Sequence, residues 1–417
     1  MRMMNETKRA RHDKKGRPEA HPPSVPWFAI LMLCLPAVFV AGSTAGAAAG
    51  AAAGADAAID QETAALEAAA LEAAALEDYA DPSEFWGRGV EAAIEAAFRE
   101  CFKTYIIGGK VMTLRMPFGE NNERAELAET ELEIRGGGKA DPGLLWDEID
   151  LLLESEDFRA YVAALSDGRE KVIAFDMTTR SWTTTRDLFH VARMKAGSYQ
   201  GLPHRPLVLS LGTGVASTDV YNYLYCVGAL GMDCSGFVWH ALSTVAERGG
   251  LDLGKALGRS LRAPRSANAS LYVGTWYFDS KIKEVATVKD EIRNLRPADV
   301  LLFRGSDGSA AHSAIIQSID RTKGEIRYLQ STDEAPLQER GVHESFIHFD
   351  PARPEVSLKD PSLVWSQKRL PPFSGERASE FADDGDRFRA FSEFGGGKVV
   401  RLKALARPIE KIRTSAR

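Results

Sequence analysis

Cysteine is scarce in this chain, and its spacing argues against two common structural roles. The 417 residues include four cysteines, at positions 34, 101, 226 and 234. They are too few and too scattered for a disulfide framework or for a zinc site built from CxxC pairs. The hydrophobic content of 44% and the charged content of 26% are ordinary for a globular protein. A chain of this length is expected to form two or three domains.

The chain also has no overall excess of positive charge. The formal net charge is −6, so the composition gives no reason to expect a nucleic-acid-binding protein. The C-terminal segment 398–417 is a local exception, with seven Lys or Arg residues and one Glu. Such a tail either contacts an anionic polymer or is simply solvated, and short charge runs favour the solvated tail.

Two stretches partly resemble cofactor-binding or metal-binding motifs but lack the full pattern. The stretch GTGVAS, Gly212–Ser217, is not part of a strand–turn–helix unit and is interpreted as a loop. HESFIH, His343–His348, resembles a zinc-protease motif, but its second histidine follows at i+5 instead of i+4. The two rings would lie on different faces of a helix, and the stretch alternates like a strand. No metal site is predicted there.

The N-terminus has the layout of an export segment. Residues 1–25 carry seven Lys or Arg and three acidic residues, and the uncharged apolar run Pro26–Ala41 follows. A basic flank, an apolar run and small residues are typical of a signal peptide, with Ala45-Gly46-Ala47 as a cleavage option. Uncharged residues continue to Ala55, so an uncleaved membrane anchor through 26–41 is the second interpretation. A disordered leader before a buried helix is the less favoured third. Residues 1–47 are therefore predicted to place the rest of the chain outside the cytoplasm, in the periplasm or cell envelope or secreted.

Three regions follow this leader. Residues 48–80 are rich in Ala and Glu, and their leucines at 66, 71 and 76 are five residues apart, which predicts a semi-rigid helical spacer and not a coiled coil. Residues 81–205 are predicted to form a small α+β domain of unknown role, with helices over 84–105 and 143–165 and a strand hairpin over 169–185. Cys101, in the first of these helices, is predicted to be a core residue. Residues 206–417 form the third region. It includes an insertion rich in Pro, Asp and Arg at 350–395 and the basic tail.

The stretch GMDCSGFVWHAL, Gly231–Leu242, predicts a helix that begins at a cysteine. Phe237, Val238 and Leu242 recur at helical spacing, and Asp233 suits a cap position. The free N–H groups and the macrodipole of a first helical turn stabilise a thiolate, which is the reactive form of Cys234. The alternative is a buried structural thiol, the commoner role of cysteine.

A nucleophile needs a base, and one follows in the three strands predicted over Ala298–Ala335. His312 lies on the middle strand and shares a face with Ala314 and Ile316 by the period of two. The third strand returns beside it, so a polar side chain there can hydrogen-bond the second imidazole nitrogen and set its tautomer. The candidates for that side chain are Gln330, Ser331 and Asp333.

GMDCSGFVWHAL resembles the Asp-Cys-Ser-Gly signature of the NlpC-type cell-wall cysteine endopeptidases. Three later segments are similar to this family in the same order, and the resemblance covers roughly residues 206–405: APRSANAS (263–270), LRPADVLLFRG (295–305) and AHSAIIQ (311–317). The chain departs from the family at Ala298, where glycine is usual, and at Ser313, where valine or alanine is usual.

The resemblance implies a papain-like α+β fold, in which the cysteine-bearing helix packs on an antiparallel sheet that carries the histidine. It implies Cys234 as nucleophile, His312 as base and Gln330, in preference to Asp333, as the residue that orients the base. The substrate-binding residues that it implies are Asp233, Ser235, Tyr223 and Tyr225.

The same resemblance implies peptidoglycan stem peptides as substrate, commonly cut between D-glutamate and diaminopimelate. Hydrolysis would pass through a thioester and needs no metal or other cofactor. Two alternatives stay open. One is a non-catalytic wall-binding or scaffold protein, and the other is an amidase or acyltransferase acting on another amide or ester.

Overall fold

The structure is a computed structural model that describes the following residues: 84–119, 140–166, 172–176, 181–185, 204–205, 217–224, 231–261, 269–332, 341–369, 379–382 and 386–415. All of them belong to one compact unit, Gly54–Arg417. The predicted leader, anchor and spacer at 1–80 lie outside the described residues. Within the described ranges, no helix is long and apolar enough to span a membrane.

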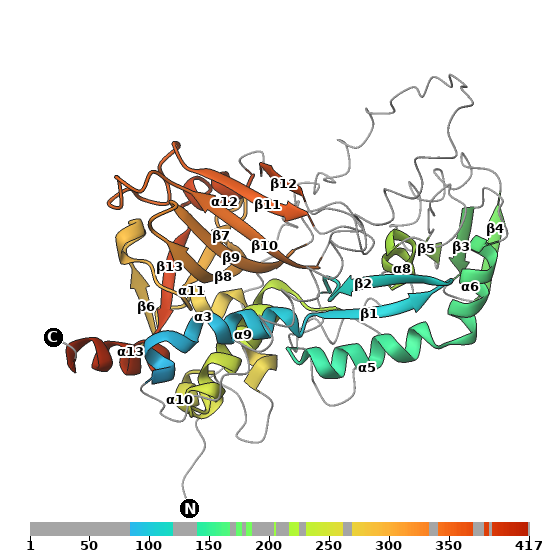
Figure 1. Ribbon diagram of the computed structural model, residues 1–417, viewed down its shortest axis with the longest axis horizontal. Coiled ribbons are helices and arrows are strands. Elements are labelled where there is room, and N and C mark those ends of the chain that lie inside the picture. Colours follow the sequence, from blue (N-terminus) through green and yellow to red (C-terminus); the bar gives the residue numbers. More distant parts are fainter. Residues whose placement is uncertain are drawn as a thin grey trace, which may run out of the picture. The chain divides into compact units, whose positions relative to one another are not determined.

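The chain has an α+β architecture around an eight-stranded antiparallel sheet (Figure 1). The strand order is β12-β11-β10-β9-β8-β7-β13-β6. The bounds are β6 (Val285–Val288), β7 (Val300–Arg304), β8 (Ala310–Asp320), β9 (Glu325–Thr332), β10 (Gly341–His348), β11 (Val364–Arg369), β12 (Ser379–Ala382) and β13 (Lys398–Leu402).

The centre of this sheet is the predicted run of three strands, β7, β8 and β9, which is confirmed. A turn at 321–324 joins β8 to β9, and Gly324 adopts a φ of 72° there. A Cβ at this position would lie 2.0 Å from the Phe349 carbonyl oxygen, so only glycine fits. The stretch HESFIH is a strand, as its alternation predicts, and forms most of β10.

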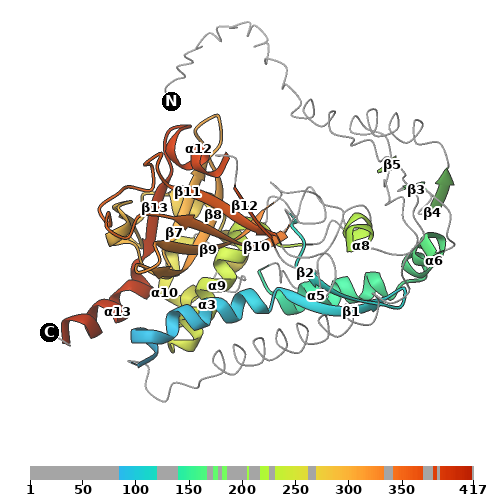
Figure 2. The ribbon, with the colours of Figure 1, turned by 45° about the horizontal axis from the view of Figure 1, so that its top comes forward.

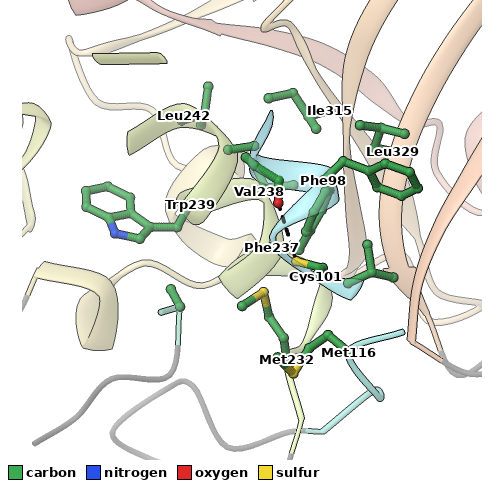
Figure 3. Close-up of a cluster of buried hydrophobic side chains, with 14 of the residues drawn as sticks. Phe98, Cys101, Met116, Met232, Phe237, Val238, Trp239, Leu242, Ile315 and Leu329 are labelled. Carbon is green, nitrogen blue, oxygen red and sulfur yellow. Dashed lines mark hydrogen bonds between the residues drawn. The ribbon is translucent and has the colours of Figure 1, made fainter. Parts of the chain in front are cut away.

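Helix α9 (Cys234–Arg248) begins at the cysteine, as the sequence predicts, and packs on one face of the sheet. Its apolar side chains, among them Phe237 and Val238, meet Ile315 of β8 and Leu329 of β9 in a continuous buried cluster (Figure 3). This packing gives α9 its stability, because isolated helices of this length are marginal in water. The short helix α12 (Asp386–Ser392) covers the opposite face, where Phe391 packs against Phe303 and Trp365.

The N-terminal described region contains a π-helical turn η1 (Phe85–Gly89), α3 (Val90–Arg99), a hairpin of β1 (Phe102–Ile107) and β2 (Lys110–Arg115), α5 (Pro142–Leu153) and α6 (Glu156–Ser166). It continues with a small sheet of β3 (Val172–Asp176), β4 (Ser181–Thr185) and β5 (His204–Arg205), and then α8 (Ser217–Tyr223). The hairpin predicted over 169–185 is confirmed by the antiparallel pairing of β3 with β4.

Two of the predicted helices in this region have different bounds. The helix predicted over 84–105 ends at Arg99, because FKTYII is rich in β-branched and aromatic residues and pairs with β2. The helix predicted over 143–165 is divided into α5 and α6. The hydroxyl of Ser155 accepts a hydrogen bond from the Phe158 N–H and donates one to the Leu152 carbonyl, which ends one helix and begins the next.

One hydrophobic core joins this region to the sheet. Helix α3 packs beside α9, as both ribbon views show (Figure 2). Phe98 and the fully buried Cys101, predicted as a core residue, lie in the same cluster as Met232 and Phe237 (Figure 3). The core thus contains residues from both sides of the boundary predicted between positions 205 and 206.

A buried ion-pair network reinforces this junction. The Arg327 guanidinium on β9 contacts the carboxylates of Glu95 on α3 and Glu344 on β10, and lies over the Phe98 ring. The side chains of the arginine and the two glutamates are 16%, 8% and 9% exposed. Each charge is therefore balanced at a place that water barely reaches.

The remaining described elements are helices and 3-10 turns around the sheet. They are α10 (Leu253–Leu257), the 3-10 turns η4 (Gly258–Leu261), η5 (Ala269–Tyr272) and η6 (Ile292–Asn294), α11 (Thr275–Asp279) and α13 (Lys403–Ser415). Just before β7, Ala298 has a φ of 67°, in the left-handed region that glycine occupies without strain. This is the position at which the NlpC-type pattern has glycine. Its N–H still donates to the Ile316 carbonyl of β8.

Replacing Arg327 with methionine is expected to lower the free energy of unfolding by roughly 3–5 kcal/mol, because a cation is removed from between two buried carboxylates. Glu95 keeps its second pair, with Arg99 at 2.7 Å. Arg353→Met is the matched control. Arg353 pairs with Asp360 at 3.5 Å with both side chains part-exposed, and should cost no more than about 1 kcal/mol. Urea denaturation measures both variants, and equal losses would contradict the role given to the buried network.

Replacing Ala298 with glycine is expected to stabilise the fold by about 1 kcal/mol, because the left-handed backbone then carries no Cβ penalty. The midpoint of urea unfolding should rise while its slope stays constant. A lower midpoint would show that the alanine methyl, 5% exposed, contributes more by packing than its backbone costs.

Candidate active site

Cys234 is the first residue of α9, and a carboxylate cap holds it there. Asp233 is extended at the N-cap, and its Oδ1 accepts from the Gly236 N–H. The Ser235 hydroxyl donates to both oxygens of the same carboxylate. Gly231 approaches the 117–119 backbone so closely that a Cβ would lie 2.3 Å from the Pro117 oxygen. These contacts seat the cysteine at the helix start that the sequence predicts.

The thiol is buried against two hydroxyl-bearing residues. Its Sγ lies 3.4 Å from Oγ1 of Thr275, the first residue of α11. The backbone N–H and the side chain of Ser313 on β8 also act on the sulfur. Burial raises the pKa of the Cys234 thiol to about 12, the Asp233 carboxylate adds to this rise, and the Thr275 and Ser313 contacts partly oppose it.

This differs from the thiolate that the sequence predicts. The helix start does supply free N–H groups, but the side chain is 8% exposed and an anionic carboxylate is its neighbour. Desolvation disfavours the charged form more than these hydrogen bonds favour it. The enclosed site therefore holds a neutral thiol.

His312 on β8 is paired with Gln330 on β9. The imidazole Nε2 lies 2.7 Å from Oε1 of Gln330, whose Nε2 donates to the Ser345 hydroxyl on β10 at 2.9 Å. In this arrangement the amide oxygen of Gln330 faces the ring and its NH2 group faces Ser345. Burial, followed by the positive charge of Arg387, holds the pKa of His312 well below its usual value.

These contacts determine the tautomer. A neutral imidazole beside a carbonyl oxygen donates through that nitrogen, so Nε2 carries the proton and Nδ1 presents a lone pair. Nδ1 is the nitrogen that can accept a proton.

The thiol lies against β8, the strand that carries the imidazole. Cys234 meets Ser313, the residue after His312. Side chains alternate along a strand, so Ser313 and His312 point to opposite faces of the sheet. Ser313 and its cross-strand partner Leu302 lie on the α9 face. His312 and its partner Phe303 lie on the α12 face. A β-bulge at Ala311 interrupts the pairing of β8 with β7 immediately before His312. Bulges of this kind redirect neighbouring side chains and are common beside active sites.

The other predicted site residues have different surroundings. Tyr223 is 1% exposed and packs between Phe158 and Tyr161, with its hydroxyl 3.2 Å from that of Ser155. A side chain so enclosed presents little surface to a substrate. Ser235 is fully buried and engaged in the helix cap.

Of the remaining candidates, Tyr225 and Asp333 lie outside the described residues. Ser331 donates its hydroxyl proton to the Met232 carbonyl, which ties β9 to the segment before α9.

Two neighbours of the site were not singled out from the sequence. Thr275 carries no motif of its own, and only the tertiary fold brings α11 to the thiol. Arg387, on α12 within the predicted insertion, lies over the Phe303 ring and donates to the Thr332 hydroxyl, although it is 1% exposed. The insertion therefore supplies a buried cation beside the imidazole.

The residues at HESFIH have structural partners. His343 donates from Nδ1 to the Gly341 carbonyl, and its Nε2 accepts from the Arg115 guanidinium. Among the residues that the structure describes, no group of three His, Cys, Asp or Glu side chains is arranged to hold a metal ion.

Replacing Asp233 with asparagine is expected to lower the pKa of Cys234, because it removes the negative charge beside the sulfur and keeps a capping oxygen. Far below the pKa, each unit of decrease raises the thiolate fraction about tenfold. Iodoacetamide alkylation followed from pH 7 to 11, with peptide-level mass spectrometry at Cys234, measures the change. Asp252→Asn is the control, since Asp252 caps α10 through the same type of bond. Equal rates in the two variants would contradict the carboxylate effect.

Comparison with known proteins adds no relative: no protein-family model matches the chain, and neither a curated protein nor a solved structure does so.

Proposed function

We propose that this protein is a cysteine peptidase with a papain-like core, in which Cys234 is the nucleophile, His312 the base and Gln330 the residue that orients the base. One observation carries the proposal. A cysteine at a capped helix start meets the strand that bears a histidine, and that histidine is hydrogen-bonded to an oriented glutamine amide. This combination supplies nucleophile, base and orienting group.

The hydrogen bonding of the His312 ring supports the same roles. Nε2 of His312 is engaged by Gln330, which leaves Nδ1 as the acceptor for the Cys234 proton. Because 312 and 313 face opposite sides of β8, transfer requires the ring edge and the sulfur to meet around the strand at the Ala311 bulge. Forming the thiolate–imidazolium pair balances both charges, which offsets the burial that holds each group neutral in isolation.

The reaction follows from these roles. The thiol proton moves to Nδ1 while sulfur attacks the amide carbonyl, and backbone N–H groups at the start of α9 stabilise the oxyanion. The C–N bond breaks, the leaving amine takes the proton from the imidazolium, and a thioester remains. Water then gives a proton to Nδ1 and attacks the thioester, which releases the acid and restores the thiol.

The substrate class rests on the sequence resemblance. The Asp-Cys-Ser-Gly signature and the ordered segments after it are similar to enzymes that cut peptidoglycan stem peptides. The export-type leader at 1–47 agrees with action outside the cytoplasm, in the periplasm or cell envelope or after secretion.

A non-catalytic wall-binding protein is the second candidate, and the buried thiol favours it. A cysteine that is 8% exposed, with a thiol pKa of about 12, has the properties of a structural residue. The complete set of Cys234, His312 and Gln330 favours catalysis instead.

Purified full chain is expected to release cleaved products from muropeptides, and Cys234→Ala and His312→Ala should each reduce the rate by at least about a thousandfold. Gln330→Ala should lower kcat more than it changes KM, because it frees the imidazole without removing a binding contact. Product analysis by liquid chromatography and mass spectrometry measures all three.

Cys101→Ala is the control, since Cys101 is buried and its thiol donates to the Ala97 carbonyl. Cleavage that survives in Cys234→Ala would exclude this nucleophile. Muropeptide binding without cleavage by the unaltered protein would establish the wall-binding candidate instead, and labelling of Cys234 by an ester or another amide would indicate an acyltransferase or amidase.

A further inference from the structure

A cavity of about 740 Å³ lies away from the thiol, and its lining includes residues of β6 and β13. These two strands lie at one end of the sheet, with β6 at the edge (Figure 1). Its lining comes from β6, η6, the turn after β8, β13 and the first turns of α13. Five arginines and two lysines line it, and among the described residues Glu91 is the one acidic lining residue. Neither Cys234, His312 nor Gln330 belongs to the lining, so this cavity does not depend on the proposed function.

Two of these cations are already balanced. Arg401 makes a bidentate pair with the buried Asp299, at 2.6 and 2.7 Å, and Arg293 pairs with Glu291 at 2.8 Å. These pairs form the structural base of the cavity wall.

Three further cations, Arg321, Lys403 and Arg407, are not paired with a carboxylate among the described residues. The Arg321 guanidinium donates to the carbonyls of Ile292 and Leu295, which holds it at the cavity without balancing its charge. Within the described ranges, Arg321, Lys403 and Arg407 have no carboxylate within ion-pair distance. Among the described lining residues, Glu91 is a single carboxylate against seven cations.

Such a concave surface favours an anion with several charges. Guanidinium groups match the oxygens of phosphate in a bidentate fork, and a phosphate group carries up to two negative charges near neutral pH. The volume is within the range of small-molecule sites. Lys403 and Arg407 come from the basic segment 398–417, for which contact with an anionic polymer was one of the two interpretations.

We propose that this cavity binds a phosphate-bearing polyanion through Arg321, Lys403 and Arg407. The phosphate groups come either from a soluble polyphosphate compound or from a phosphodiester polymer that passes through the cavity.

The test uses the full chain and isothermal titration calorimetry with two probes, inorganic tripolyphosphate and a short poly(glycerol phosphate), at 50 and 200 mM NaCl. Arg321→Ala and Arg407→Ala should each weaken binding about tenfold, and binding should weaken with salt. Arg407 is exposed on α13, so its variant tests the proposal even if loss of the Arg321 carbonyl contacts unfolds the chain. Lys283→Ala is the control, because this lysine is 91% exposed and does not line the cavity.

Tighter binding of tripolyphosphate assigns a soluble ligand, and tighter binding of the polymer assigns a phosphodiester chain. The proposal is overturned if neither probe binds, if Lys283→Ala weakens binding as much as Arg407→Ala, or if heparin, a sulfated polyanion, binds as tightly as both phosphate probes.

Discussion

The packing of α9 on β8 and β9, with Asp233 as its cap, is the constraint on which the rest of the structure depends. Phe237 and Val238 of the helix pack against Ile315 and Leu329 of the sheet, and the Asp233 carboxylate caps the start of the helix. Because the first residue after the cap is Cys234, the apolar face of the helix also determines where the sulfur meets the sheet. Helix α3 lies behind α9, and Arg327 ties it to β9 through Glu95. Any loosening of this core would move the thiol.

Burial and reactivity act in opposite directions at this position. The enclosure that places the thiol beside β8 also raises its pKa and lowers that of His312, so each group is neutral when taken alone. In the proposed mechanism, proton transfer between the two would make a charge pair whose attraction compensates for part of the desolvation. Arg387 opposes the imidazolium, because it places a cation beside the ring from the α12 side. The insertion that carries α12 therefore bears directly on whether the pair can form.

Charge is distributed unevenly over the rest of the described fold. At Arg327 and Arg401 the cations are matched by buried carboxylates and hold elements together. Around the β6–β13 edge, cations from η6, α13 and the turn after β8 outnumber the acids, and the wall is held by backbone carbonyls and by pairs that lie beneath it. Paired charges of the first kind stabilise a fold, whereas an excess of one sign in a concave surface favours a ligand of the opposite sign.

The local elements around the candidate site could be predicted from the sequence. The cap and start of α9, the three strands over 298–335, the strand at HESFIH and the burial of Cys101 follow from spacing and alternation, which act over a few residues. Even the unusual backbone of Ala298 coincides with a position where the similar family has glycine.

Only the tertiary structure decided the contacts between distant segments. These contacts place Thr275 and Ser313 at the thiol and Arg387 beside His312. They also enclose Tyr223 and bring η6 and α13 to the same cavity. The end of α3 at Arg99 belongs with these, since FKTYII became a strand only by pairing with β2. Periodicity reports which face of an element is apolar. The pKa of a group and its partners depend on what covers that face, and that follows from the whole packing.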